Sequence, residues 1–198
     1  MQGKLIFLLE ELSMKTLLDN LLPRLFPGWE EQKHFLCVAH QGKSDLDKSI
    51  PRKLKAWRSP QEQVIFVIVR DNDGADCIKQ KQELRDKCLQ AGRPDTLIRL
   101  VCQELESWYL GDLDALDKAF DAKVNIPKNR KRFANPDAWQ KPSREVERLV
   151  PCFQKQSGAR KLAEHLDAQH NRSHSFQVFV KGVSRLARSD RLPSRRTS

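Results

Sequence analysis

Six carboxylate side chains follow short apolar runs of this sequence, and their positions suit chemistry that needs several acids together. They are Glu10, Glu11, Asp71, Asp73, Glu104 and Glu106. Like charges crowded into one place raise each other's pKa values, and a bound cation removes that cost. Carboxylate oxygens are hard ligands that suit Mg²⁺ or Mn²⁺, and such an ion activates water for displacement at phosphorus. The pattern therefore predicts a divalent-metal site.

Each acidic stretch also has a simpler interpretation. Asp-Asn-Asp-Gly at residues 71–74 is typical of an ordinary strand-to-helix turn, with Asp76 as the helix N-cap. An EF-hand loop is excluded because its glycine and its terminal glutamate would be out of place. Glu10 and Glu11 are also typical of a solvated approach to a helix. Acids at three separate strand ends favour the metal site over these readings.

The elements that must position these acids are four short apolar runs. Each run is nearly continuous and rich in Val, Ile, Leu and Phe, as expected of strands covered on both faces of a parallel sheet. The runs are Leu5–Leu9, Phe35–Ala39, Val64–Val69 and Leu97–Cys102. The carboxyl ends of parallel strands share one rim, where ligands bind at the point at which the strand order reverses. We therefore expect the acids to meet at this rim.

Helical patterns separate the four runs. Leucines at helical spacing follow Ser13 and stop at Pro27-Gly28, a second pattern follows Asp45, and a third runs from Asp76 to Gly92. The order β-α-β-α-β-α-β is typical of a doubly wound, three-layer α/β fold with right-handed crossovers. The fold class predicted is a Rossmann-like, mostly parallel sheet of about four strands flanked by helices.

The texture changes after Cys102. Residues 102–120 predict one or two short helices, and residues 124–145 read as a long polar connection with three prolines. Helical patterns return over 144–150, 158–166 and 175–186. We therefore expect an α/β core over residues 1–120, a basic helical extension packed on it over 121–188, and a disordered tail over 189–198.

The positive charge lies almost entirely in the second part. Residues 1–120 carry a net charge of −1, whereas residues 121–198 carry +11, within a total of +10 for the chain. Such an excess attracts a polyanion through salt-sensitive phosphate contacts. The side chains expected to meet phosphates are Arg144, Arg160, Lys161 and Arg172. A solubilising surface is the alternative interpretation of the same charge.

Cysteine and hydropathy patterns bear on location. The five cysteines show no CxxC spacing and read as reduced thiols, and the histidines near residue 170 lack the regular partners of a zinc site. The first apolar run is too short for a signal peptide or a membrane span, and no later window is long enough. We expect a soluble cytoplasmic protein without a membrane segment.

The arrangement of these motifs resembles a known family. Glu10, followed by Ser13-Met14-Lys15 and a leucine-rich helix, and a strand ending in Asp71-Asn72-Asp73 resemble the Toprim domain of topoisomerases and primases. More narrowly, the chain is similar to small stand-alone Toprim-like bacterial proteins that typically lie beside AAA-type ATPases in phage-defence cassettes. The segments LLEELSMKTLLDNLLPRLFP, RDNDGADC, CQELESWYLGDLDALDKAF, NPDAWQKPSRE, KQSGARKLAEHL and NRSHSF carry that likeness.

The resemblance implies roles for the acids. It makes Glu10 a metal ligand or a general acid-base group, and Asp71 and Asp73 metal ligands for Mg²⁺ or Mn²⁺. Glu104 and Glu106 are implied to line the same catalytic site. The usual Toprim glutamate is followed by glycine, whereas Glu11 stands at that position here.

Three functions follow as hypotheses. The first is a metal-dependent nuclease acting on DNA or RNA, the effector of an ATPase-linked phage-defence system. The alternative is a non-catalytic regulatory subunit that docks to an AAA-type ATPase. The third is a phosphoacceptor receiver domain, which also carries acids after its first and third strands. Against the receiver stand the lack of a fifth strand ending in lysine and the glutamates that follow the fourth apolar run.

Overall fold

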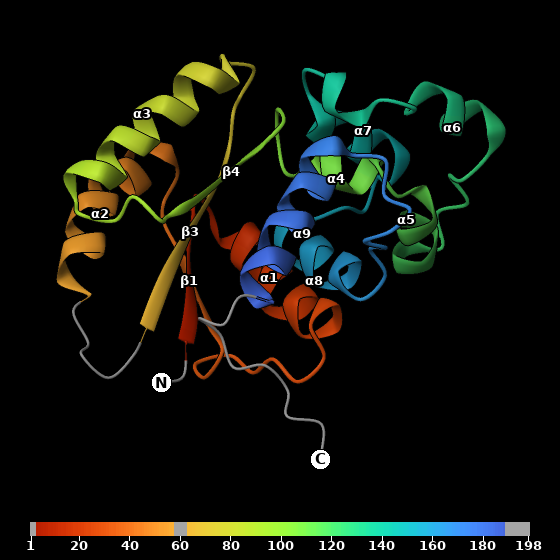
Figure 1. Ribbon diagram of the computed structural model, residues 1–198. Coiled ribbons are helices and arrows are strands. Elements are labelled where there is room, and N and C mark those ends of the chain that lie inside the picture. Colours follow the sequence, from red (N-terminus) through yellow and green to blue (C-terminus); the bar gives the residue numbers. More distant parts are fainter. Residues whose placement is uncertain (1–2, 58–62, 189–198) are drawn as a thin grey trace.

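A four-stranded, entirely parallel sheet forms the centre of the protein (Figure 1). The computed structural model describes residues 3–57 and 63–188. The strands are β1 (Gly3–Leu9), β2 (Phe35–Ala39), β3 (Gln63–Asp71) and β4 (Leu97–Val101), in the order β2-β1-β3-β4. The predicted α/β class with about four parallel strands is confirmed. The third strand continues beyond the predicted Val69, so that Asp71 is its last residue.

Helices connect and cover the strands. Those of the first half are α1 (Leu12–Leu25), α2 (Lys43–Ala56) and α3 (Cys77–Gln90). Those of the second half are α4 (Glu106–Leu110), α5 (Leu113–Phe120), α6 (Pro127–Arg132), the 3-10 helix η1 (Pro136–Ala138), α7 (Pro142–Leu149), α8 (Lys155–Ala163) and α9 (His174–Ala187). Asp76 accepts hydrogen bonds from the backbone N–H groups of Ile78 and Lys79, which confirms it as an N-cap. Among the described helices, none is long and apolar enough to cross a membrane.

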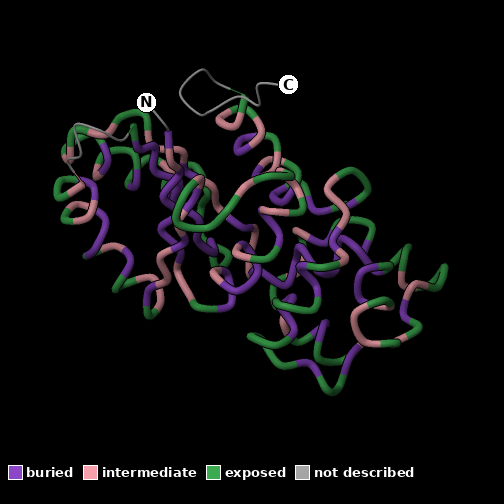
Figure 2. Tube along the Cα trace, turned by 90° about the horizontal axis from the view of Figure 1, so that it is seen from below, coloured by how far each residue is buried: buried purple, intermediate pink, exposed green. Residues whose placement is uncertain are grey.

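The two faces of the sheet have different covers because successive side chains of a strand point to opposite sides. Ile6 and Leu8 lie in a hydrophobic cluster with residues of α2 and α3. Leu5, Phe7 and Leu9 lie in a larger cluster with α1 and the helices of the second half. Figure 1 shows α2 and α3 on one side of the sheet and α1, α8 and α9 on the other. Figure 2 shows buried residues mainly in the interior of the molecule and exposed residues on its outer turns.

The second half of the chain belongs to the same core as the first. Trp108 packs against Phe176 and Phe179 of α9, with ring centroids 5.0 and 5.1 Å apart, and Phe179 lies 6.5 Å from Phe7 of β1. The net charge of the sequence changes sign near residue 120, but the hydrophobic core continues across that point. The division into core and extension stays a prediction, and the tail predicted over 189–198 lies outside the described residues.

One stretch differs from the sequence-based expectation. Residues 124–145 are not one long polar connection but contain α6, η1 and the start of α7. Pro127, Pro136 and Pro142 each stand at the first or second position of one of these helices. A proline fits there because its missing N–H has no partner in the first turn in any case and its φ already suits a helix. The prolines begin helices rather than interrupt them.

The direction in which strands are added to the sheet reverses between β1 and β3, and we call this place the switch point. The chain moves from β1 to β2 on one side of the sheet and then crosses to β3 on the other side of β1. Ligands of open parallel sheets bind at the carboxyl ends of the strands where the order reverses in this way. Here those ends belong to β1 and β3, which finish immediately before Glu10 and at Asp71.

Candidate functional site

Glu10 and Asp71 meet at the switch point. The carboxylate of Glu10 accepts a hydrogen bond from the backbone N–H of Asp71 at 3.1 Å, and the Glu10 N–H donates to the carbonyl of Val69 at 3.3 Å. Burial raises the pKa of the Glu10 carboxyl, and the nearby charge of Asp73 raises it further. The first and third strands therefore deliver two acids to one place, as the sequence predicts.

Asp71 is the more deeply buried of the two. It is 9% exposed, and its Oδ1 has no hydrogen-bond partner. Burial raises its pKa well above the usual value, and Glu10 and Glu106 add to the effect through their charges. A buried carboxylate oxygen without a partner is costly and is satisfied by a proton, a water molecule or a cation.

Glu106 joins this pair from the first turn of α4. It is 2% exposed, its Oε2 also has no hydrogen-bond partner, and burial raises its pKa to about 7. The hydroxyl of Tyr109, one turn further along α4, is likewise buried without a partner. With the hydroxyl of Ser107, four buried polar atoms without a hydrogen-bond partner therefore come from the end of β3 and from α4.

Lys155 supplies positive charge to these acids. Its Nζ lies 3.8 Å from a carboxylate oxygen of Glu11 and 3.9 Å from one of Glu106. Although burial opposes the shift, Glu106 and Glu11 raise the pKa of this lysine. Lys155 could not be predicted from its sequence position, because the packing of α8 on α1 brings this residue to the rim.

Asp73 and Glu104 lie at the periphery of the site. Asp73 is exposed, and its carboxylate lies 3.6 Å from Nζ of Lys43. Glu104 accepts a hydrogen bond from the backbone N–H of Ser143 at 2.8 Å and lies 3.5 Å from Nζ of Lys141. Burial opposes any lowering of its pKa, but these contacts lower it overall. Both acids have partners that Asp71 lacks, so the buried centre consists of Glu10, Asp71 and Glu106.

Asn72 fixes the turn between the two aspartates. Its side-chain amide donates to the carbonyl of Ala75 at 3.0 Å, and its carbonyl oxygen accepts from the backbone N–H of Gln103. Its own N–H donates to the carbonyl of Val101 at 3.0 Å. Asn72 therefore ties the end of β3 to the end of β4, which sets the positions of both acidic stretches.

The position where the resembled family has glycine creates no backbone strain here. Glu11 has φ −141° and ψ 167°, an extended conformation that any residue adopts. Its carboxylate accepts a hydrogen bond from the hydroxyl of Ser13 at the start of α1. Glutamate is therefore compatible with this turn and adds one more carboxylate to the rim.

The donor set fits a hard divalent cation. Carboxylate oxygens of Glu10, Asp71 and Glu106 are the ligands that Mg²⁺ or Mn²⁺ prefers, and two of these oxygens have no partner. Within residues 3–57 and 63–188, however, no three Asp, Glu, His or Cys side chains are already arranged around a common metal position. Binding of an ion by these three acids therefore requires rotation of their side chains.

The side chains predicted to contact phosphates are all exposed but have different neighbours. Nζ of Lys161 lies 5.2 Å from the ring centroid of Phe120, and Arg172 donates to the carbonyl of Arg130 at 2.9 Å. Arg144 lines a hollow of about 560 Å³ on α7, and Arg160 is on α8. Their part in binding nucleic acid stays a prediction.

Comparison with known proteins gives one match. A family model described as "Domain of unknown function (DUF4276)" matches residues 9–184, a range that includes all six acids of the rim. No curated protein and no solved structure matches the chain.

Proposed function

We propose that this chain, which belongs to the DUF4276 family, is a divalent-metal-dependent nuclease whose site is centred on Glu10, Asp71 and Glu106. One observation carries the proposal: Asp71, which has a buried carboxylate oxygen without a partner, lies beside Glu10 at the switch point of a parallel sheet, and buried Glu106 is near enough for its charge to raise the pKa of Asp71. Sites of this kind hold ligands, and strongly shifted carboxyl groups within them favour a functional role.

The residues divide the work as follows. Glu10, Asp71 and Glu106 would hold Mg²⁺ or Mn²⁺, which when bound supplies an activated water and neutralises charge on a phosphodiester. Burial raises the pKa of Glu10 in the metal-free site, and coordination of the ion would displace its proton. The half-exposed ammonium of Lys155 is positioned to attract the phosphate. Asp73 and Glu104, held by Lys43 and by the start of α7, complete the rim.

The cellular setting is part of the proposal. All five cysteines are free in the structure, which agrees with a reducing compartment such as the cytoplasm. The resemblance to Toprim-like proteins of phage-defence cassettes supports a role as an effector linked to an AAA-type ATPase. DNA and RNA remain alternative substrates within this proposal.

A cleavage assay with a charge-neutralising variant tests it. Labelled plasmid DNA and total RNA are incubated with wild type, Asp71→Asn or Asp86→Asn in Mg²⁺, Mn²⁺ or EDTA. Asp86 is an exposed acid on α3 and serves as the matched control. We expect metal-dependent cleavage by wild type and Asp86→Asn, and a loss of about a hundredfold or more in Asp71→Asn.

Equal cleavage by wild type and Asp71→Asn would contradict the metal site at Asp71. If none of the three proteins cleaves, even with an AAA-type ATPase of the proposed kind present, the nuclease proposal fails and docking to such an ATPase becomes the better account. Co-elution of the chain with the ATPase in size-exclusion chromatography then tests the docking function.

A further inference from the structure

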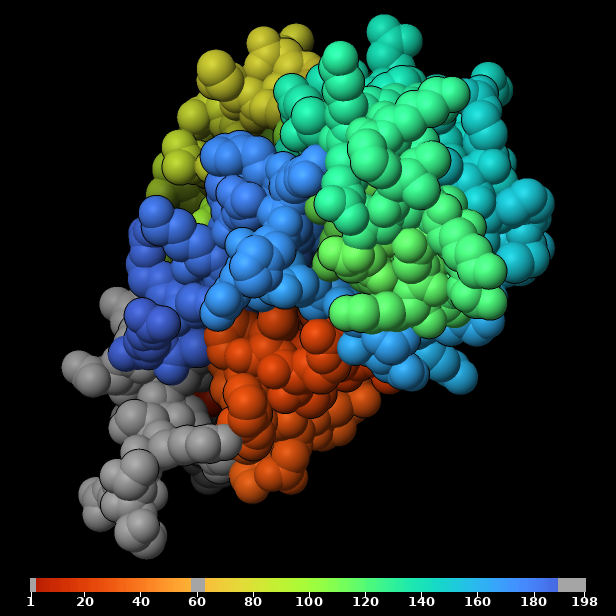
Figure 3. All heavy atoms as spheres, turned by 90° about the vertical axis from the view of Figure 1, so that its right-hand side faces the viewer, coloured from red at the N-terminus to blue at the C-terminus, as the bar shows by residue number. Residues whose placement is uncertain are grey.

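A second charged region lies along the free edge of the sheet and is formed by three elements. It consists of Lys81 and Arg85 on α3, Arg99 on the edge strand β4, and Lys181, Arg185 and Arg188 on or at the end of α9. We call these six residues the basic edge. In Figure 3 the blue atoms of α9 lie at the surface, with the olive atoms of α3 beside them.

Arg99 is the centre of the basic edge. Its Nε donates to the carbonyl of Val178 at 3.1 Å, and its guanidinium lies against Gly182, where a Cβ atom would collide with it. The side chain is half-buried between β4 and α9. Contact with backbone alone holds its position but does not neutralise its charge.

Within the described ranges 3–57 and 63–188, none of the six cations forms an ion pair. Neither β4 nor α9 contains an aspartate or glutamate, whereas α3 carries the exposed acids Glu83 and Asp86. Burial and then the charge of Arg185 lower the pKa of Arg99, and burial and then Arg99 lower that of Lys81. Like charges gathered in this way favour an anionic partner.

The shape of this region also suits an extended ligand. Lys181, Ser184, Arg185 and Arg188 line a hollow of about 700 Å³ on the outer face of α9. The register between strands pairs Asp71 with Val101 and Val69 with Arg99, so Arg99 lies two residues along β4 from the level of the acidic rim. A strand bound along the basic edge therefore runs towards Glu10 and Asp71.

We propose that the basic edge binds the sugar–phosphate backbone of a nucleic acid and leads it to the acidic rim. The location rests on charge and contacts at α3, β4 and α9, whereas its connection to cleavage rests on the proposed nuclease function. Repeated phosphates at regular spacing match a row of cations drawn from three elements, and this contact is independent of base sequence.

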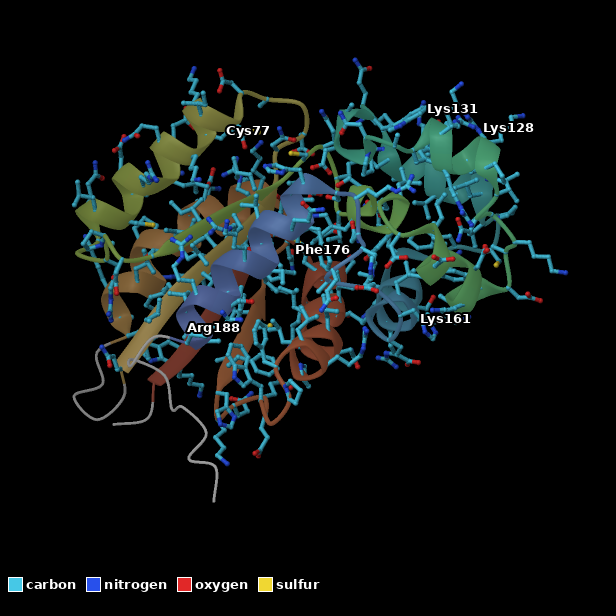
Figure 4. The ribbon with its side chains drawn as sticks, turned by 45° about the vertical axis from the view of Figure 1, so that its right-hand side comes forward. Cys77, Lys128, Lys131, Lys161, Phe176 and Arg188 are labelled. Carbon is cyan, nitrogen blue, oxygen red and sulfur yellow. The ribbon has the colours of Figure 1, made fainter. Side chains whose placement is uncertain are left out.

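Binding measured without divalent metal separates this inference from the proposed nuclease. Labelled single-stranded DNA, its duplex and RNA of the same sequence are titrated in EDTA at several salt concentrations. The test variant is Lys181→Ala/Arg185→Ala/Arg188→Ala, which changes exposed residues of the basic edge. The control is Lys118→Ala/Lys128→Ala/Lys131→Ala, which removes the same charge from exposed residues of α5 and α6. Figure 4 shows Lys128 and Lys131 on the other side of α9 from Cys77, the first residue of α3.

We expect the basic-edge variant to bind about tenfold or more weakly than wild type, with a salt slope smaller by about 2, while the control variant keeps most of the affinity. The polymer that shows the largest loss identifies DNA or RNA as the ligand. Equal losses in both variants, or no loss in the basic-edge variant, would overturn the inference. Displacement by an acidic polypeptide as effective as that by nucleic acid would overturn the assignment of the ligand. Circular dichroism of both variants verifies that they fold.

Discussion

The acidic rim and the basic edge are two regions in which like charges crowd together, but they treat that charge differently. At the acidic rim, lysines 43, 141 and 155 lie within 4.0 Å of carboxylates, and the most buried acids have pKa values raised towards the neutral form. At the basic edge, none of the six cations forms an ion pair within the part of the chain that the structure describes, and Arg99 is held by the backbone carbonyl of Val178. The rim therefore reduces its own charge, whereas the edge leaves its charge available.

Because of this difference, the acidic rim and the basic edge suit different partners. A compact group of buried oxygens with raised pKa values favours a small cation, which displaces protons. A half-exposed row of cations on an edge strand and two helices favours a long polyanion. Placed next to each other, the two regions fit a protein that holds a nucleic acid on one surface and acts on it at another.

The first prediction concerns the pH dependence of stability that buried Glu106 causes at the acidic rim. Its pKa of about 7 lies above the ordinary 4.5, so the folded protein holds this proton between those values. As the pH rises through that interval, Glu106 ionises in the unfolded chain but stays protonated in the folded protein. The unfolded state is therefore favoured, and the free energy of unfolding falls. Glu106→Gln removes the cost, and we expect it to raise the free energy of unfolding by about 2–3 kcal/mol near pH 8, measured in urea with EDTA.

The gain in Glu106→Gln should shrink towards zero below about pH 4, where both forms are neutral. Glu83→Gln, which changes an exposed acid of α3, serves as the control and should have no such effect. If wild type is more stable than Glu106→Gln at high pH, the ionised Glu106 carboxylate is stabilised by its surroundings, and this prediction is wrong.

A smaller effect is expected at the basic edge from Gly182→Ala. The added Cβ collides with the guanidinium of Arg99, so either the helix or the arginine must move. We expect weaker nucleic-acid binding in EDTA and a loss of about 1 kcal/mol or less in unfolding free energy, because the colliding atoms are the end of a flexible side chain and alanine favours the helix. The double variant Gly182→Ala/Arg99→Ala relieves the collision and should recover stability but not binding. If both variants bind nucleic acid as tightly as wild type, Arg99 does not contribute to binding.

The smallest effect concerns the lysine that neutralises the rim. Lys155→Met removes the ammonium near Glu11 and Glu106 while keeping the aliphatic packing. Because this lysine is half-exposed, we expect a loss of only about 0.5–1 kcal/mol near pH 8 without metal, which saturating Mg²⁺ should restore. Thermal unfolding with and without Mg²⁺ checks this. A loss that Mg²⁺ leaves unchanged would contradict the shared role of lysine and metal at the rim.

Much of the fold could be predicted from local patterns, because continuous apolar runs and helix caps are local signals. Asp76 as an N-cap and Asp71 at the end of a buried strand are examples. The deep burial of Glu106 and the position of Lys155 at the rim could not be predicted in this way. They depend on the packing of α4 against α7 and of α8 against α1, which are contacts between distant parts of the sequence. No pattern near Lys155 in the sequence marks it as a neighbour of the acids.

Charge counted by segment does not show which charged side chains lie together in space. The net charge of +11 after residue 120 predicts a basic surface in the second half, whereas the basic edge combines α9 with Lys81, Arg85 and Arg99 from the part with a net charge of −1. In a sum along the chain, the positive charges of Lys81 and Arg85 are cancelled by acids such as Glu83 and Asp86 of the same helix. Only the sheet order brings β4 beside α9 and α3.

Calorimetric titration of Mg²⁺ or Mn²⁺ into wild type and Asp71→Asn tests the central claim most directly, because it needs neither substrate nor partner. The account predicts that wild type binds a divalent ion and releases protons as the raised pKa values of Asp71 and Glu106 fall, and that Asp71→Asn loses this binding. Identical titrations for the two proteins, or no binding by wild type, would contradict it.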